Sequence, residues 1–118
     1  MKQINIQAYC KASAEALGLK TRLSAWPSTP GQLCYYPYEK NKMLYIPWQP
    51  DKDANQQNMI EDWLIEQGYA IEVTHWDEVV SWRVSIWDKA PTIKIIEMFG
   101  KSKSIAFAKA FMSYINNQ

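Results

Sequence analysis

The chain has 118 residues, of which 47% are hydrophobic and 21% are charged, and its formal charge at pH 7 is +1. This composition is typical of a folded globular protein and argues against a disordered chain, while the length predicts a single domain over residues 1–118. A charge this close to zero excludes the strong positive field of proteins that bind DNA non-specifically.

The first third of the chain predicts one helix and one weak hairpin. An alanine-rich stretch, residues 4–19, predicts a helix that ends near Gly18. Prolines and a glycine between residues 27 and 31 predict a loop. Two short strand candidates follow, residues 33–36 and 43–46, and the polar segment between them predicts a β-hairpin.

The middle of the chain predicts a second helix. Asp51 or Asp53 offers an N-cap, because a carboxylate accepts hydrogen bonds from the free N–H groups of a first helical turn. The helix is expected to run to about residue 67, with Trp63 on its apolar stripe and Gly68 just past its end.

The pattern of alternating residues is strongest after this helix. Residues 69–75 and 80–86 alternate apolar and polar side chains, and the short connection between them predicts an antiparallel hairpin. Residues 92–98 predict a third strand, with Ile93 and Ile95 facing the core.

A last helix completes the predicted fold. Ser102 or Ser104 offers its N-cap, its apolar side includes Phe111, and it ends near residue 116. A run of strands with helices before and after it favours the α+β class. We expect a three-stranded antiparallel meander with helices on both of its faces, and the short N-terminal hairpin as an additional element.

Several short segments carry a resemblance to a known family. They are YIPWQP at residues 45–50, EQGY at 66–69, SWRV at 81–84 and SIAFAKA at 104–110, with AEALGL at 14–19. In this order they resemble the phage ABA sandwich domain, a family of small bacteriophage and prophage proteins. The resemblance implies a helix–sheet–helix sandwich and a phage or prophage origin. It implies no catalytic residues.

The charged side chains are unevenly distributed. Residues 1–50 carry six basic and two acidic side chains, residues 51–88 carry two basic and nine acidic, and residues 89–118 carry five basic and one acidic. One interpretation is ordinary solvated surface. The other is an acidic middle segment that faces a basic partner or mimics an acidic one.

Few residues suggest catalysis. His75 with Asp77 or Glu78 offers a general base oriented by a carboxylate, which keeps an enzyme among the hypotheses, although a histidine at a turn is the expected interpretation. Cys10 and Cys34 are expected to be small buried residues. No metal site, cofactor or phosphate-binding loop is expected.

Aromatic residues are the one feature that the predicted core does not absorb. The chain has six Trp, seven Tyr and three Phe, and many lie in predicted loops and strand ends. Such side chains, exposed together, are typical of interaction hot spots. The candidate binding surface comprises Trp26, Tyr35, Tyr36, Tyr38, Tyr45 and Trp48, together with Asp51 and Asp53 of the acidic helix.

These observations predict a phage- or prophage-derived, non-enzymatic protein that binds a host protein by surface contact, with counter-defence as one such role. Two alternatives stay open: a small-molecule or nucleotide-binding protein with an aromatic-lined pocket, and a self-associating accessory protein that forms a homodimer. A nucleic-acid partner is not expected, because the acidic middle segment repels phosphate. Neither a membrane-spanning run nor a secretory leader is recognised, which predicts a cytoplasmic protein, here the host cytoplasm, without a membrane partner.

Overall fold

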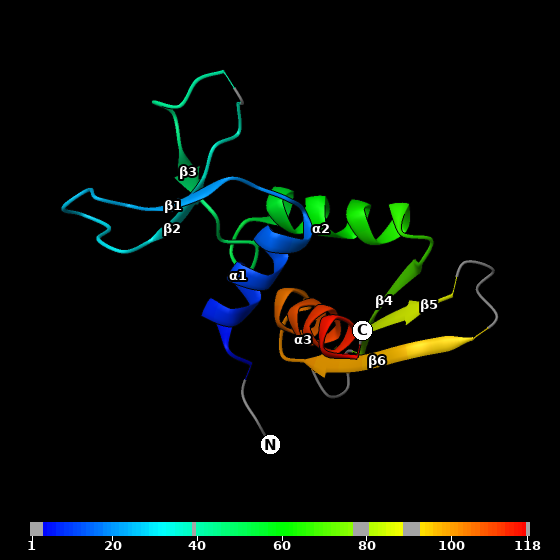
Figure 1. The fold of residues 1–118 in the computed structure, drawn as a ribbon. Coiled ribbons are helices and arrows are strands. Elements are labelled where there is room, and N and C mark those ends of the chain that lie inside the picture. The colour runs from blue at the N-terminus through cyan, green and yellow to red at the C-terminus, as the bar shows by residue number, and fades with distance from the viewer. Residues whose placement is uncertain (1–3, 39, 77–80, 89–92, 118) are drawn as a thin grey trace.

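The computed structural model describes residues 4–38, 40–76, 81–88 and 93–117, and within them the chain forms three helices and two antiparallel three-stranded sheets (Figure 1). The predicted α+β class is therefore confirmed. In chain order the elements are α1 (Ile6–Ala16), β1 (Thr21–Leu23), β2 (Leu33–Tyr35), β3 (Ile46–Pro47), α2 (Ala54–Glu66), β4 (Ala70–Trp76), β5 (Ser81–Trp87), β6 (Lys94–Gly100) and α3 (Lys103–Asn116).

Polar side chains fix where the helices begin. Asn5 accepts a hydrogen bond from the backbone N–H of the third residue after it, and Ser102 does the same at the start of α3. Asp53 accepts two backbone N–H groups at the start of α2. These side chains satisfy donors that have no partner within the helix. The predicted caps Asp53 and Ser102 are confirmed, and Gly68 follows α2 with a φ of +99°.

The predicted meander is the second sheet, β4–β5–β6. Its register pairs Ile71 with Ile86 and Val73 with Val84, and it pairs Ile86 in turn with Ile96. Side chains alternate between the two faces of a strand, so these apolar residues share one face. Val84, Ile86 and Ile96 are all buried in the main core.

The prediction for the third strand is wrong about which residues face inward. Ile93 and Ile95 are 63% and 47% exposed, whereas Ile96 is only 8% exposed. The β5–β6 register pairs Ile86 with Ile96, so Ile96 shares the inward face and the adjacent Ile95 lies on the opposite face; the register shifts only beyond this pair, between Ile86 and Trp87. Apolar residues at 93, 95, 96 and 98 fit either face, so the pattern alone does not decide between them.

Helix α3 is the centre of the core. It packs on β5 and β6 and also contacts α1. Three alanines on α3 and both of its phenylalanines are wholly buried. The small alanine side chains let neighbouring elements approach the helix closely. Gly100 shows how close the approach is: a Cβ there would lie 2.7 Å from the backbone nitrogen of Ala106.

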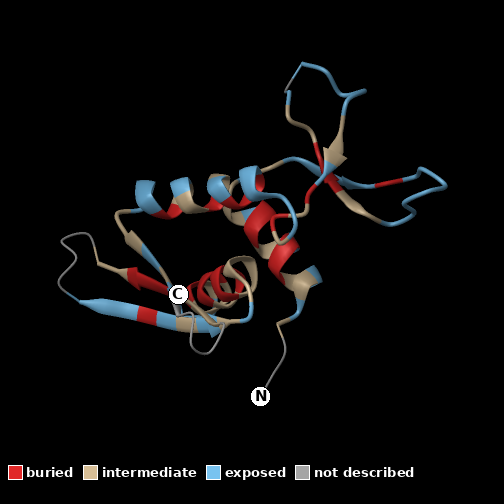
Figure 2. Cartoon of the chain, turned by 180° about the vertical axis from the view of Figure 1, so that it is seen from behind, coloured by how far each residue is buried: buried red, intermediate tan, exposed pale blue. Residues whose placement is uncertain are grey.

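The expected helix–sheet–helix sandwich is not confirmed. The described helices all lie on one side of β4–β6, with α3 next to the sheet (Figure 1). Much of β6 is exposed to solvent, as Figure 2 shows. The second face of the sheet carries a row of charges: Arg83 lies 3.8 Å from both Glu72 and Glu97, and Lys94 lies 2.6 Å from Glu97. The hydrogen bond from Lys94 lowers the pKa of the Glu97 carboxyl.

The first sheet, β1–β2–β3, projects away from the helices (Figure 1). The predicted hairpin is present, since Tyr35 pairs with Ile46, but its second strand is Ile46–Pro47 and not residues 43–46. Strand β1 joins it as a third strand that the sequence did not predict. We call residues 20–47 the arm. Among the described residues, no helix is long and apolar enough to cross a membrane.

Candidate functional site

Trp48 joins the arm to α1. Its indole is wholly buried, and Nε1 donates hydrogen bonds to the carbonyl oxygen of Cys10 at 3.0 Å and to Oγ of Ser13 at 3.1 Å. The ring of Tyr35 meets it edge-on, with 5.2 Å between centroids. Trp48 and Tyr35 were predicted to belong to the binding surface, and this is wrong: both are core residues. The indole N–H explains the difference, because a buried donor needs partners and α1 provides two.

The acidic residues of the predicted surface have structural partners. Asp53 is exposed and caps α2. Asp51 is half-buried and accepts a hydrogen bond from Sγ of Cys10 at 3.7 Å. Beside them, the amide of Gln56 accepts from the backbone of Gln49 at 2.6 Å and donates to the carbonyl of Pro47 at 2.8 Å. The base of the arm is therefore held to both α1 and α2.

Two other predicted residues, Tyr36 and Tyr45, lie together on the arm. Both are half-buried, and their rings meet edge-on with 6.0 Å between centroids. The guanidinium of Arg22 lies 4.4 Å from the centroid of the Tyr45 ring. This is cation–π geometry, so the three side chains stabilise one another at the surface of the arm.

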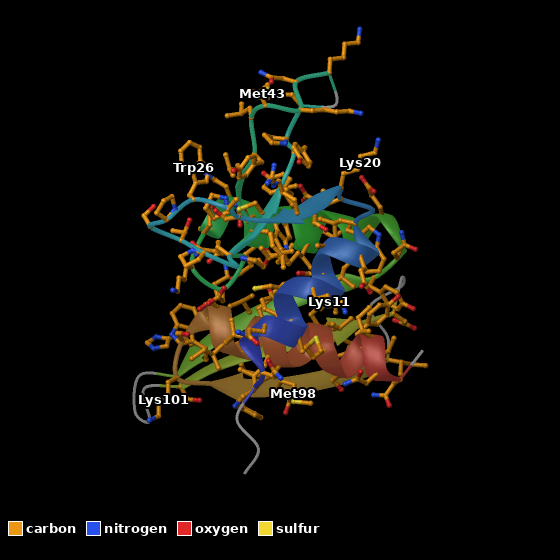
Figure 3. The ribbon with its side chains drawn as sticks, turned by 60° about the vertical axis from the view of Figure 1, so that its left-hand side comes forward. Lys11, Lys20, Trp26, Met43, Met98 and Lys101 are labelled. Atoms are coloured by element: carbon orange, nitrogen blue, oxygen red, sulfur yellow. The ribbon has the colours of Figure 1, made fainter. Side chains whose placement is uncertain are left out.

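The remaining predicted residues, Trp26 and Tyr38, are exposed in the two loops that connect the strands of the arm. Each is 61% exposed, and Met43, which lies in the same β2–β3 loop as Tyr38, is 90% exposed. Figure 3 shows Trp26, Met43 and Lys20 at the arm, away from the β4–β6 sheet. We call Trp26, Tyr38 and Met43 the arm tips. Burial of large apolar side chains stabilises a protein or a complex. These three side chains gain that free energy only when a partner covers them.

The arm is also basic. It has four exposed basic side chains, which are Lys20, Arg22, Lys40 and Lys42. Its sequence contains a single acidic residue, Glu39, which lies outside the described residues. The acidic residues of the following segment begin at Asp51, beyond the arm. The arm therefore presents apolar and positively charged groups together, which suits an acidic partner.

Two hollows lie beside β1. The first has a volume of about 570 Å³ and lies between α1 and the arm; its lining includes Cys10, Asp51, Leu23 and Leu33. The second has a volume of about 500 Å³, and its lining includes Lys20, Tyr36 and Lys42. Of the predicted aromatic residues, Trp48 lines the first and Tyr36 the second. Neither hollow is the aromatic-lined pocket that the small-molecule alternative expects.

The two thiols are poor nucleophiles. Burial, together with the negative charge and hydrogen bonding of Asp51, raises the pKa of the Cys10 thiol to about 12. Burial also raises the pKa of Cys34. Because the thiolate is the reactive form, both side chains stay protonated and inert near neutral pH.

We therefore expect Cys10 to resist alkylation in the folded protein. At about pH 8, iodoacetamide should label it at least about a hundredfold more slowly than in the chain unfolded by guanidinium, because so little thiolate is present. Mass spectrometry of timed samples measures both rates. Asp51→Asn should speed the reaction only modestly, since burial is the larger cause of the raised pKa. Rapid labelling of Cys10 in the native protein would contradict this assignment.

His75 lies apart from both hollows. Its side chain is exposed on β4, and its ring lies over Trp82 with 4.5 Å between centroids. Asp77 and Glu78 fall outside the described residues, so the hypothesis of a histidine base with a carboxylate stays untested. Within residues 4–38, 40–76, 81–88 and 93–117, no cluster of three or more histidine, cysteine, aspartate or glutamate side chains could hold a metal ion.

Comparison with protein-family models, with curated proteins and with solved structures finds no match to this chain. The candidate site therefore rests on its own geometry. The surface predicted from the sequence did not include Arg22, Leu23 or Met43. The clustering of four basic residues around the tyrosines was the available signal for Arg22, whereas Leu23 lies on a strand too short to give any periodicity.

Proposed function

We propose that this chain is a non-enzymatic binding protein that acts on another protein through its arm. The single observation that carries the proposal is the exposure of Trp26, Tyr38 and Met43 on the two loops of a projecting sheet whose base is anchored in the core. Aromatic and methionine side chains are enriched in protein interfaces, and exposed clusters of them gain free energy when a partner excludes water.

The charge of the arm adds to this support. Basic groups close to apolar side chains favour a partner with acidic groups beside an apolar patch, and they accelerate association with it. The resemblance to phage ABA sandwich proteins supplies the biological setting of the proposal, in which the partner is a host protein in the host cytoplasm. A gene neighbourhood of small phage genes would support that setting, and a bacterial operon of unrelated enzymes would contradict it.

A test compares two triple variants of the full chain. Trp26→Ala, Tyr38→Ala and Met43→Ala together remove the arm tips, while Ile65→Ala, Ile93→Ala and Phe99→Ala remove exposed apolar side chains elsewhere. With partner protein captured from host lysate on immobilised wild-type protein, we expect the arm-tip variant to retain at least about tenfold less. The second variant should retain as much as the wild type.

The identity of the captured protein is then confirmed with the purified pair by calorimetry. Equal affinity of the wild type and the arm-tip variant, measured by the same method, would reject the arm as the contact surface. Circular dichroism of each variant checks that the fold is retained, and the exposed positions of all six residues make that the expected result.

The first hollow favours a second candidate function. Its volume of about 570 Å³ lies within the range of small-ligand sites, and it combines apolar walls with the polar groups of Cys10 and Asp51. A small molecule bound there would raise the melting temperature of the protein. A ligand screen by thermal shift, with Asp51→Asn as the control variant, separates this candidate from the first.

A further inference from the structure

Strand β1 has an unpaired edge. It is the end strand in the order β1–β2–β3, and all three of its residues are exposed. The backbone N–H of Tyr36 donates to the carbonyl of Lys20 at 3.1 Å, and that of Ser24 donates to Gln32 at 2.8 Å. Hydrogen-bonded pairs alternate along an antiparallel ladder. The backbone groups of Thr21 and Leu23 therefore point away from β2.

No described strand pairs with these outward groups. The carbonyl of Leu23 accepts a long hydrogen bond, 3.4 Å, from Nε of the neighbouring Arg22, and the described residues include no other partner for it. A row of free N–H and C=O groups on an exposed edge is a template for another extended chain. The edge runs between the two hollows, since Thr21 contributes to the lining of both.

The two faces beside this edge differ in chemistry. Thr21 and Leu23 alternate with Lys20 and Arg22 along the strand, so the two pairs point to opposite faces. Leu23 lies opposite Leu33 in the register, and both line the first hollow. Lys20 lines the second hollow with Lys42. One face thus offers the two leucines within a hollow of mixed lining, and the other face is basic.

We propose that the β1 edge binds an extended segment of a partner protein in which apolar and acidic side chains alternate. The backbone of the segment pairs with Thr21 and Leu23. Its apolar side chains enter the first hollow, against Leu23 and Leu33, and its acidic side chains face Arg22 and Lys20. This inference rests on the proposed function, and it specifies how the arm holds its partner.

Two other occupants fit the edge less well. In an antiparallel pair of β1 strands from two copies, the Lys20 and Arg22 side chains of both copies would share one face, and like charges side by side destabilise a pair. Single-stranded nucleic acid would stack its bases on exposed aromatic rings. Tyr36 and Tyr45 are half-buried against each other, and Arg22 already covers the ring of Tyr45. The exposed rings of Trp26 and Tyr38 belong to the loops that follow β1 and β2 and not to the β1 edge.

The test uses a defined probe, a capped nine-residue peptide of alternating valine and aspartate. Its controls are the same peptide with lysine in place of aspartate, and the valine–aspartate peptide with alternate backbone amides methylated. We expect at least about tenfold weaker binding of the lysine peptide and of the methylated peptide. Hydrogen exchange followed by NMR should show new protection at the Thr21 and Leu23 amides and little change at the β4–β6 sheet.

A pair of substitutions at one position isolates the backbone contact. Leu23→Pro and Leu23→Ala both remove the leucine side chain, but only proline removes the outward N–H, and proline is tolerated on an edge strand. We expect Leu23→Pro to bind the valine–aspartate peptide about fivefold or more weakly than Leu23→Ala. Arg22→Glu should weaken binding further than Lys101→Glu, an equal charge change at an exposed position far from the arm (Figure 3).

Several results would overturn the proposal. They are equal binding by the two Leu23 variants, equal binding of the methylated and unmethylated peptides, a β1-dependent dimer in sedimentation, or tighter binding of an oligothymidine strand than of the peptide. If Leu23→Pro fails to fold, the comparison of the methylated and unmethylated peptides still decides whether backbone hydrogen bonds hold the peptide. A partner that needs the arm tips but binds Leu23→Pro normally would reject strand addition and leave the proposed function standing. A partner that binds regardless of the arm tips would reject the proposed function instead.

Discussion

We expect Trp48→Ala to lower the free energy of unfolding by about 3–5 kcal/mol, which is a large part of the stability of a small domain. The indole is wholly buried, so its removal leaves a cavity between the arm and α1. It also takes away the hydrogen bonds to Cys10 and Ser13 that join the arm to α1. The measurement is chemical denaturation followed by circular dichroism.

Two further substitutions separate the causes of this loss. Trp48→Phe keeps an aromatic ring but removes the donor, and we expect a loss of about 1–3 kcal/mol from the missing hydrogen bonds to Cys10 and Ser13. Trp26→Ala makes the same change as Trp48→Ala on an exposed arm residue, and its effect should stay within about 0.5 kcal/mol. A loss for Trp48→Ala no greater than that for Trp26→Ala would contradict the anchoring role of Trp48.

The position of Trp48 could not be predicted from its surroundings in the sequence. It lies between two prolines, in a segment without helical or strand periodicity, and such segments usually run over the surface. Its partners on α1 are 38 and 35 residues away along the chain. Burial there is decided by tertiary contacts, which leave no local pattern. The same argument applies to Tyr35, whose partner is Trp48 itself.

Elements with strong local signals were predicted well. Helix α2 begins just after its cap Asp53 and ends before Gly68, as the cap and the glycine indicate, and the β4–β5 hairpin follows a clear two-residue period. Strand β1 is three residues long and gave no such signal. The open face of β4–β6 was also missed. The charges at Glu72, Arg83 and Glu97 indicate a solvated face, but helices at both ends of the chain suggested a sandwich.

The exposure of the candidate surface was predicted in part. Trp26 and Tyr38 are exposed and Tyr36 and Tyr45 lie together on the arm, because aromatic residues beyond the needs of the core collect outside the periodic elements. The edge of β1 was not predicted. It depends on the order of three strands in a sheet and on the direction of hydrogen bonds within it, and neither follows from the residues of β1 alone.

Phe111→Ala should cause a loss of similar size, about 3–5 kcal/mol, through a different part of the core. Phe111 lies on α3 and is wholly buried. Its ring meets that of Tyr9 on α1 at 5.9 Å and that of Trp63 on α2 at 6.2 Å, both edge-on. One side chain thus connects all three described helices, and its removal leaves each of them with an unfilled contact.

The matched variants for this position are Phe111→Leu and Asn116→Ala. Leucine keeps most of the buried apolar volume but loses two edge-to-face contacts of about 0.5–1.5 kcal/mol each, so we expect an intermediate loss. Asn116 is exposed at the end of the same helix, and its replacement should change stability by less than about 0.5 kcal/mol. Denaturation curves of all three variants rank these effects. If Phe111→Ala unfolds at the same denaturant concentration as Asn116→Ala, the three helices do not share one core at this ring.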